Sequence, residues 1–230
     1  MTTTLRFARP FALLIGPFLL AATLVPAGAS ADRPLTEDLE EVGERIRLAP
    51  GEISLLIERS DLFLQEARPE DALVDLHVAA ALAPDDPRIG AQRAVVLHAM
   101  SRHDEALAEI DAALARVHAP SFPDLALRAR ILSALGRPED AIDEYGAALA
   151  LRDDVELYLE RGRLLERLGR ADEAAHGYDE GMRALGGAVI LRVAAIELDL
   201  RTAHADRALA RIDEVLARAP ARARWLLLRA

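Results

Sequence analysis

Five alanines recur along the chain at intervals of 34, 35, 33 and 34 residues, and each lies two places after an acidic residue. They are Ala72, Ala106, Ala141, Ala174 and Ala208, and each begins an apolar pattern of helical spacing. A constant period of this size is typical of a solenoid, in which each unit buries its apolar face only against its neighbours. The period therefore predicts an all-α repeat array.

Alignment on these alanines divides the chain into five units of similar length. The predicted units are 53–86, 87–121, 122–154, 155–188 and 189–222. The spacing of aromatic, small and apolar side chains is clearest in the fourth unit, through Tyr158, Gly162, Leu165, Gly169, Ala174, Tyr178 and Gly181. This pattern resembles the tetratricopeptide repeat (TPR) family. The resemblance implies a right-handed α-solenoid of about five helix-turn-helix repeats. We expect a capping helix within 32–52 and a capping or half-repeat helix at 223–230.

Small residues indicate where the two helices of each unit meet. The eighth position of the first helix carries Ser60, Ala94, Ala129 and Gly162 in the first four units. Two facing small residues let helix backbones approach more closely than the usual separation of about 8–10 Å. The turns between the helices are predicted at Ala67, Ser101, Gly136, Gly169 and Ala203, where glycine suits a left-handed cap best.

The fifth unit departs from this pattern at two positions. Ile196 stands where the other units have a small residue, and Arg207 stands where they have an acid. We expect its two helices to be less closely packed than those of the other units.

The first 31 residues have the features of an export signal. Arg6 and Arg9 precede an apolar run at 11–25, and Ala29 and Ala31 form an A-x-A site for cleavage before Asp32. The run is short and is interrupted by Pro17, so a cleaved signal fits better than an uncleaved anchor. We expect an exported protein, periplasmic or secreted, without stable membrane insertion after cleavage.

The composition excludes several classes of partner and site. The chain has no cysteine, which rules out a lipid-anchored lipoprotein, disulfides and thiolate metal sites. Its formal net charge is −10 and it has no basic tract, so nucleic acid is not an expected partner. No histidine pair has the four-residue spacing of a helical zinc site, and no nucleophile elbow or phosphate loop is present. We expect no enzyme, no cofactor and no metal.

The resemblance implies a binding groove lined by the second, fifth, ninth, twelfth and thirteenth positions of the first helices. The candidate groove residues on this chain are Arg88, His98, Arg130, Arg163, Glu166, Arg167 and Arg201. Arginine holds a carboxylate through two parallel hydrogen bonds, so the predicted partner is a protein or peptide with an acidic segment or an exposed C-terminus. In the alternative, carboxylates of the chain itself, such as Glu166, occupy these arginines. The family's chaperone-tail binders use Lys and Asn in the groove, and this chain has neither residue.

An apolar run closes the chain at Trp225, Leu226, Leu227 and Leu228. Solenoids usually end in a polar cap. Two interpretations follow, a short helix that covers the last groove or a surface on which a second copy assembles. The first predicted function is a non-catalytic protein-binding adaptor or scaffold, and the alternative is a structural subunit that self-associates through Trp225, Leu226 and Leu228.

Overall fold

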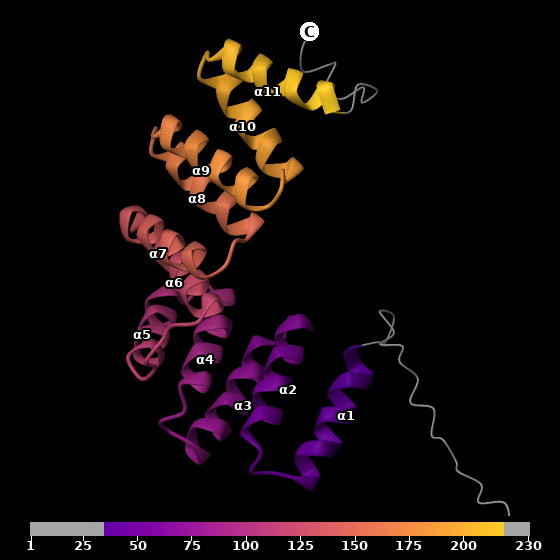
Figure 1. The fold of residues 1–230 in the computed structure, drawn as a ribbon. Helices are drawn as coiled ribbons and strands as arrows, with labels where there is room; N and C mark the ends of the chain where they lie inside the picture. The colour runs from indigo at the N-terminus through magenta and orange to yellow at the C-terminus, as the bar shows by residue number, and fades with distance from the viewer. Residues whose placement is uncertain (1–34, 219–230) are drawn as a thin grey trace, which may run out of the picture. The chain divides into compact units, whose positions relative to one another are not determined.

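A computed structural model describes residues 35–218, which form eleven α-helices and no β-strand (Figure 1). In chain order these are α1 (Leu35–Leu48), α2 (Ile53–Gln65), α3 (Pro69–Leu82), α4 (Pro87–Ala99), α5 (His103–Leu114), α6 (Phe122–Ala134), α7 (Pro138–Leu151), α8 (Val155–Arg167), α9 (Ala171–Ala184), α10 (Val189–Arg201) and α11 (Ala205–Arg218). Among them, no helix combines the length and the hydropathy that crossing a bilayer requires. The predicted signal at 1–31 and the predicted helix at 223–230 lie outside the described residues.

Ten of these helices form five helix-turn-helix repeats, and α1 precedes them as a single capping helix. Each repeat pairs a first helix with a second helix, and the second helix packs on the first helix of the next repeat. The first helices are α2, α4, α6, α8 and α10, and the second helices are α3, α5, α7, α9 and α11. The predicted all-α array of about five repeats is confirmed.

The turn inside every repeat contains one residue in the left-handed region. These residues are Ala67, Ser101, Gly136, Gly169 and Ala203, with φ between 57° and 73°. In the first four turns this residue donates its backbone N–H to a carbonyl of the preceding helix, as in Ala67 to Leu64 and Gly169 to Glu166. The predicted turn positions are confirmed. Three of the five are not glycine and carry a conformational cost of about 1–2 kcal/mol each.

An arginine before the second helix explains part of the recurring acidic pattern. In four repeats this arginine forms an ion pair with the acid three residues later: Arg68 with Asp71, Arg102 with Glu105, Arg137 with Asp140 and Arg170 with Glu173, at 2.6–2.7 Å. The same acids lie in the first helical turn, where negative charge is favoured by the helix dipole. The acidic pairs are therefore part of the helix starts.

The fourth repeat shows why small residues are required between paired helices. A Cβ atom built on Gly162 of α8 would lie 2.2 Å from the ring of Tyr178 on α9. A Cβ on Gly181 would lie 2.7 Å from the ring of Tyr158. Both tyrosines are buried, so each ring fills the space that a side chain on the opposite glycine would need.

The fifth repeat is packed in spite of its unusual residues. Ile196, Ala208 and Ile212 are fully buried in one apolar cluster between α10 and α11. The cluster is buried, but α10 and α11 share fewer close backbone contacts than the two helices of any other described repeat, as expected for a less closely packed pair. Ile196 stands where the fourth repeat has Gly162, and Ile212 stands where it has Tyr178.

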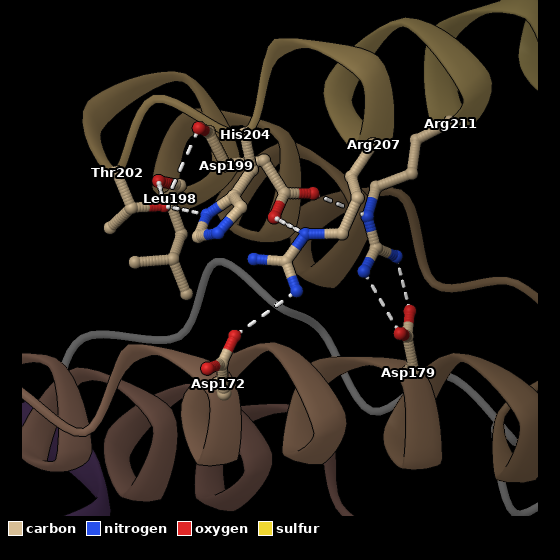
Figure 2. A network of polar contacts seen from close by, with 8 residues as sticks. All are labelled: Asp172, Asp179, Leu198, Asp199, Thr202, His204, Arg207 and Arg211. Atoms are coloured by element: carbon tan, nitrogen blue, oxygen red, sulfur yellow. Dashed lines mark hydrogen bonds and ion pairs between the residues drawn. The ribbon is translucent and has the colours of Figure 1, made fainter.

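Arg207 has a structural role in the fifth repeat (Figure 2). Its guanidinium lies 3.0 Å from the fully buried carboxylate of Asp199 and also reaches Asp172 of α9. Arg211 donates to Asp199 at 2.8 Å and also forms an ion pair with Asp179 of α9. These contacts connect α9, α10 and α11. A buried carboxylate is tolerated here because two guanidinium groups surround it.

Candidate functional site

The seven predicted groove residues lie on one set of helices. Arg88 and His98 are on α4, Arg130 is on α6, and Arg201 is on α10. Arg163, Glu166 and Arg167 are on α8. All are exposed or half-buried. We call the side chains at positions 2, 5, 9, 12 and 13 of α2, α4, α6, α8 and α10 the first-helix surface.

Position 9 of one first helix lies beside position 6 of the next. Asp61 of α2 accepts a hydrogen bond from Gln92 of α4. Two repeats later, Arg130 of α6 donates to Glu160 of α8 at 2.9 and 3.1 Å. Arg130 is therefore bound to Glu160 and not to Glu166.

The same register leaves one arginine without an acid. Arg163 is at position 9 of α8, and position 6 of α10 is Ala194. Within residues 35–218 Arg163 forms no hydrogen bond and no ion pair, and it is exposed. Its guanidinium is available to a ligand because alanine stands where Glu160 stands one repeat earlier.

A second register joins position 12 of one first helix to position 13 of the next. Arg201 of α10 binds Glu166 of α8, which also accepts a hydrogen bond from Tyr178 at 2.6 Å. Arg167 of α8 meets Ser133 of α6 in the equivalent place, at 3.5 Å. A serine hydroxyl at that distance leaves the charge of Arg167 without a carboxylate partner.

The pKa shifts agree with this division into occupied and available groups. The hydrogen bond and the charge of Glu166 raise the pKa of Arg201. For Arg130, burial lowers the pKa, but the hydrogen bond and charge of Glu160 outweigh it and raise the pKa overall. Burial, with the hydrogen bond to Glu166, raises the pKa of Tyr178 and keeps its hydroxyl protonated as a donor.

Arg88 and His98 are less suited to hold a carboxylate. Arg88 forms an ion pair at 2.6 Å with Asp86, the N-cap residue of α4 two places before it. The Nδ1 atoms of His98 and His103 are 3.2 Å apart. Burial and the neighbouring charges of His103 and Arg130 lower the pKa of His98, so its ring is neutral near pH 7.

Between α4 and α6, the same two positions carry apolar side chains instead of polar or charged ones. Position 9 of α4 is Val95 and position 6 of α6 is Leu127. Both line a hollow of about 540 Å³ together with Ile57, Ala91 and Val117. We call this the apolar hollow. Its rim carries Ser54, Arg88, Gln92, Ser121 and Asp124.

Sequence reasoning did not identify the apolar hollow or the pairing of Arg130 with Glu160. Both depend on position 6 of the first helix, which the positions implied by the resemblance leave out. Comparison of position 9 with position 6 of the next unit would have revealed them.

The recurring arginines at position 7 of the first helices are structural. They pair with an acid on the second helix of the same repeat: Arg59 with Asp75, Arg93 with Glu109, Arg128 with Glu144 and Arg161 with Glu180, at 2.6–3.1 Å. Ala195 occupies this position in α10, and Arg211 of α11 supplies the positive charge instead.

Residues 35–218 contain no cluster of three or more His, Asp or Glu side chains placed to hold a metal ion. Trp225, Leu226 and Leu228, the predicted self-association residues, lie outside the described residues.

Solved structures with the same fold are TPR proteins. YrrB, a TPR protein with an unusual peptide-binding site, is 18% identical, with a TM-score of 0.59 over 82% of this chain and 97% of its own. PilW, a type IV pilus biogenesis factor, is 14% identical, with a TM-score of 0.70 over 85% of this chain and 91% of its own. A tetratricopeptide repeat protein from Parabacteroides merdae is 18% identical, with a TM-score of 0.60 over 85% of this chain and 77% of its own.

No protein-family model matches the sequence, and a search of curated proteins finds no match. The structural likenesses establish that the described residues have the TPR fold, as the sequence pattern implied.

Proposed function

We propose that the protein is an exported, non-catalytic adaptor that binds an extended segment of another protein on its first-helix surface. The observation that supports this most directly is the state of Arg163 and Arg167. Both are exposed on α8, four residues apart on one helical face, and neither has a carboxylate partner among residues 35–218. A ligand carboxylate would supply that partner.

The partner segment carries an acidic side chain or a C-terminal carboxylate at Arg163 and Arg167. Arg130 and Arg201 lie beside them but are bound to Glu160 and Glu166. They contribute positive potential, while the two unpaired arginines make the direct hydrogen bonds. Hydrogen bonds to a charged group are worth about 1.5–3 kcal/mol each.

An apolar side chain of the same segment enters the apolar hollow between α4 and α6. Neighbouring helices are about 8–10 Å apart, so roughly 10–20 Å separates the hollow from α8. An extended peptide rises about 3.3 Å per residue, which puts roughly three to six residues between the apolar and acidic positions. YrrB, a structural neighbour, is a TPR protein with a peptide-binding site, which supports the same use of the fold here.

The setting is the cell envelope or the outside of the cell. This part of the proposal rests on the basic, apolar and small-residue pattern of residues 1–31. A signal-processing assay that finds Asp32 at the N-terminus of the exported protein would support it, and recovery of the intact chain in the cytosol would contradict it.

The binding test compares two double variants of equal charge. Arg163→Ser/Arg167→Ser removes the unpaired arginines of the first-helix surface. Arg183→Ser/Arg192→Ser removes two arginines that also lack carboxylate partners but lie outside it. Short peptides with an apolar residue followed by acidic residues are titrated by fluorescence anisotropy, and the same peptides with Gln for Glu serve as neutral controls.

We expect affinity to fall by about ten- to a hundredfold in the Arg163/Arg167 variant and to be unchanged in the Arg183/Arg192 variant. Equal affinity of the native chain for acidic and neutral peptides would contradict the proposal. So would an equal loss in both variants, which would indicate bulk charge attraction.

A second candidate function is self-assembly through the C-terminal end of the array. It is favoured by exposed apolar side chains on α10, since Val189, Ile190 and Leu200 are 53%, 52% and 45% exposed. Ile190 and Leu200 belong to the first-helix surface in the last described repeat. The sequence also predicts self-association through Trp225, Leu226 and Leu228. A molecular mass that rises with concentration and returns to the monomer in a Leu200→Glu variant would support this function. A constant monomer mass would exclude it.

A further inference from the structure

A second hollow lies outside the first-helix surface, where α9, α10 and α11 meet. Its volume is about 640 Å³, and none of its lining residues belongs to the first-helix surface. The lining is mostly charged and consists of His176, Asp179, Met182, Arg183, Gly186, Gly187, Arg192, Arg211 and Glu214. We call it the arginine hollow.

Two of its arginines lack partners in a chain where most arginines have them. Arg183 in the last turn of α9 and Arg192 in the first turn of α10 form no hydrogen bond and no ion pair among residues 35–218. The chain has 38 acidic residues against 28 basic ones, so carboxylates are in excess. Arg192 is also half-buried, which removes water from its guanidinium without a compensating hydrogen bond.

The remaining charges of the hollow do not cancel these two arginines. Asp179 is bound through both oxygens by Arg211, which also binds the buried Asp199. Glu214 is the other carboxylate on the lining. The lining itself therefore places three arginines beside two carboxylates, on a protein of formal charge −10.

The loop between α9 and α10 keeps the hollow open beside Arg192. Gly186 and Gly187 have φ of 65° and 97°, a region that suits glycine. A Cβ atom on Gly187 would lie 3.3 Å from Nη2 of Arg192. The glycine thus lets the guanidinium lie close over the loop, within the hollow.

We propose that the arginine hollow binds the phosphate group of a small phosphorylated molecule. A phosphate monoester carries about −1.5 to −2 charges and three acceptor oxygens, which suits two guanidinium groups that approach from different helices. A single carboxylate has one charge and two oxygens, so it would neutralise only one of these two arginines. The volume is within the range of about 300–1,000 Å³ that small-molecule sites occupy. This site does not depend on the proposed function of the first-helix surface.

The test is calorimetric titration of the purified full chain in a phosphate-free buffer. Glycerol phosphate is the probe for a soluble ester, inorganic phosphate is the probe for the group alone, and vesicles that contain phosphatidic acid, a phosphate monoester, are the probe for a lipid headgroup. Vesicles of phosphatidylcholine control for membrane contact. Arg183→Ser/Arg192→Ser is the test variant, and Arg163→Ser/Arg167→Ser is the control with the same charge.

We expect saturable binding of glycerol phosphate that weakens about tenfold or more in the Arg183/Arg192 variant and is unchanged in the Arg163/Arg167 variant. Arg192→Lys keeps the charge but loses the fork of donors, so it is expected to keep part of the affinity. Binding of phosphatidic acid vesicles alone, lost in the same variant, would support the phosphate group and assign it to a lipid.

The absence of saturable binding to all three phosphate probes would overturn the proposal. An equal loss in both double variants would overturn it as well, because it would show attraction to charge without a site. Far-ultraviolet circular dichroism of each variant establishes that the comparison is between folded proteins.

Discussion

The Nε–H of Arg130 on α6 is shared between the two carboxylate oxygens of Glu160 on α8, at 2.9 and 3.1 Å, across the boundary between two repeats. One repeat later, Ala194 stands at the position equivalent to Glu160, so Arg163 has no acid beside it. The difference between Glu160 and Ala194 at equivalent positions therefore leaves Arg130 paired within the fold and Arg163 available to a ligand.

The close contact between α8 and α9 predicts a sharp cost for a single methyl group. Gly162→Ala would place a Cβ 2.2 Å from the ring of Tyr178, so the helices or the ring must move. We expect a loss of about 1–3 kcal/mol in the free energy of unfolding, measured by urea denaturation.

The control is Gly146→Ala on α7, where the new Cβ would be 3.9 Å from the nearest atom, on Arg161. It should be neutral or stabilising by up to about 1 kcal/mol, because alanine favours the helix. Equal effects at Gly146 and Gly162 would contradict the close packing of Tyr178.

The left-handed turns predict a stabilising substitution. Ala203 has φ of 60° in the turn between α10 and α11, so Ala203→Gly removes a strain of about 1–2 kcal/mol at an entropic cost of about 0.5–1 kcal/mol. We expect a net gain of up to about 1 kcal/mol, read from the thermal midpoint.

Ala81→Gly in α3 is the matched change at an exposed helical position and should destabilise by about 1 kcal/mol. A destabilised Ala203→Gly variant would show that the left-handed conformation carries no strain there.

The paired histidines predict a dependence of stability on pH. Burial, then the positive charges of His103 and Arg130, lower the pKa of His98 from its ordinary 6.5, and Glu160 acts in the opposite direction. The unfolded chain therefore binds a proton at a higher pH than the folded chain. The stability that the neutral ring contributes is present above about pH 6.5 and is lost as the pH falls below it.

Thermal midpoints measured between about pH 7.5 and 5 should fall more steeply for the native chain than for His98→Gln, which cannot be protonated. Parallel curves for the two proteins would contradict an unfavourable charge at His98.

Much of the fold could be predicted because the sequence repeats. The spacing of Ala72, Ala106 and the later alanines predicted the helix pairs, and the turn positions followed from the same alignment. The packing of Ile196 could not be predicted in this way. Ile196 packs against Ala208, Ile212 and Val215 of α11, and whether these side chains leave room for it depends on how the two helices pack.

The sequence predicted which helices carry the candidate site residues, but it did not predict which side chains pair with them. The resemblance placed Arg163 and Arg167 on the first helices. It did not predict that Glu160, and not Glu166, would bind Arg130, because ion pairs depend on which side chains of two neighbouring helices face each other. The ion pairs around the buried Asp199 involve side chains of three helices, so no sequence pattern within one helix predicts them.

The most direct test of the account is to supply Arg163 with the acid that its repeat lacks. Ala194→Glu places a carboxylate at the position that Glu160 occupies one repeat earlier, and Ala194→Gln is the uncharged control of the same size. Affinity for the acidic peptide is measured by fluorescence anisotropy. The account predicts a fall of about tenfold or more for Ala194→Glu and little change for Ala194→Gln, with equal helicity in both. Undiminished binding by the Ala194→Glu protein would contradict recognition of the partner by Arg163.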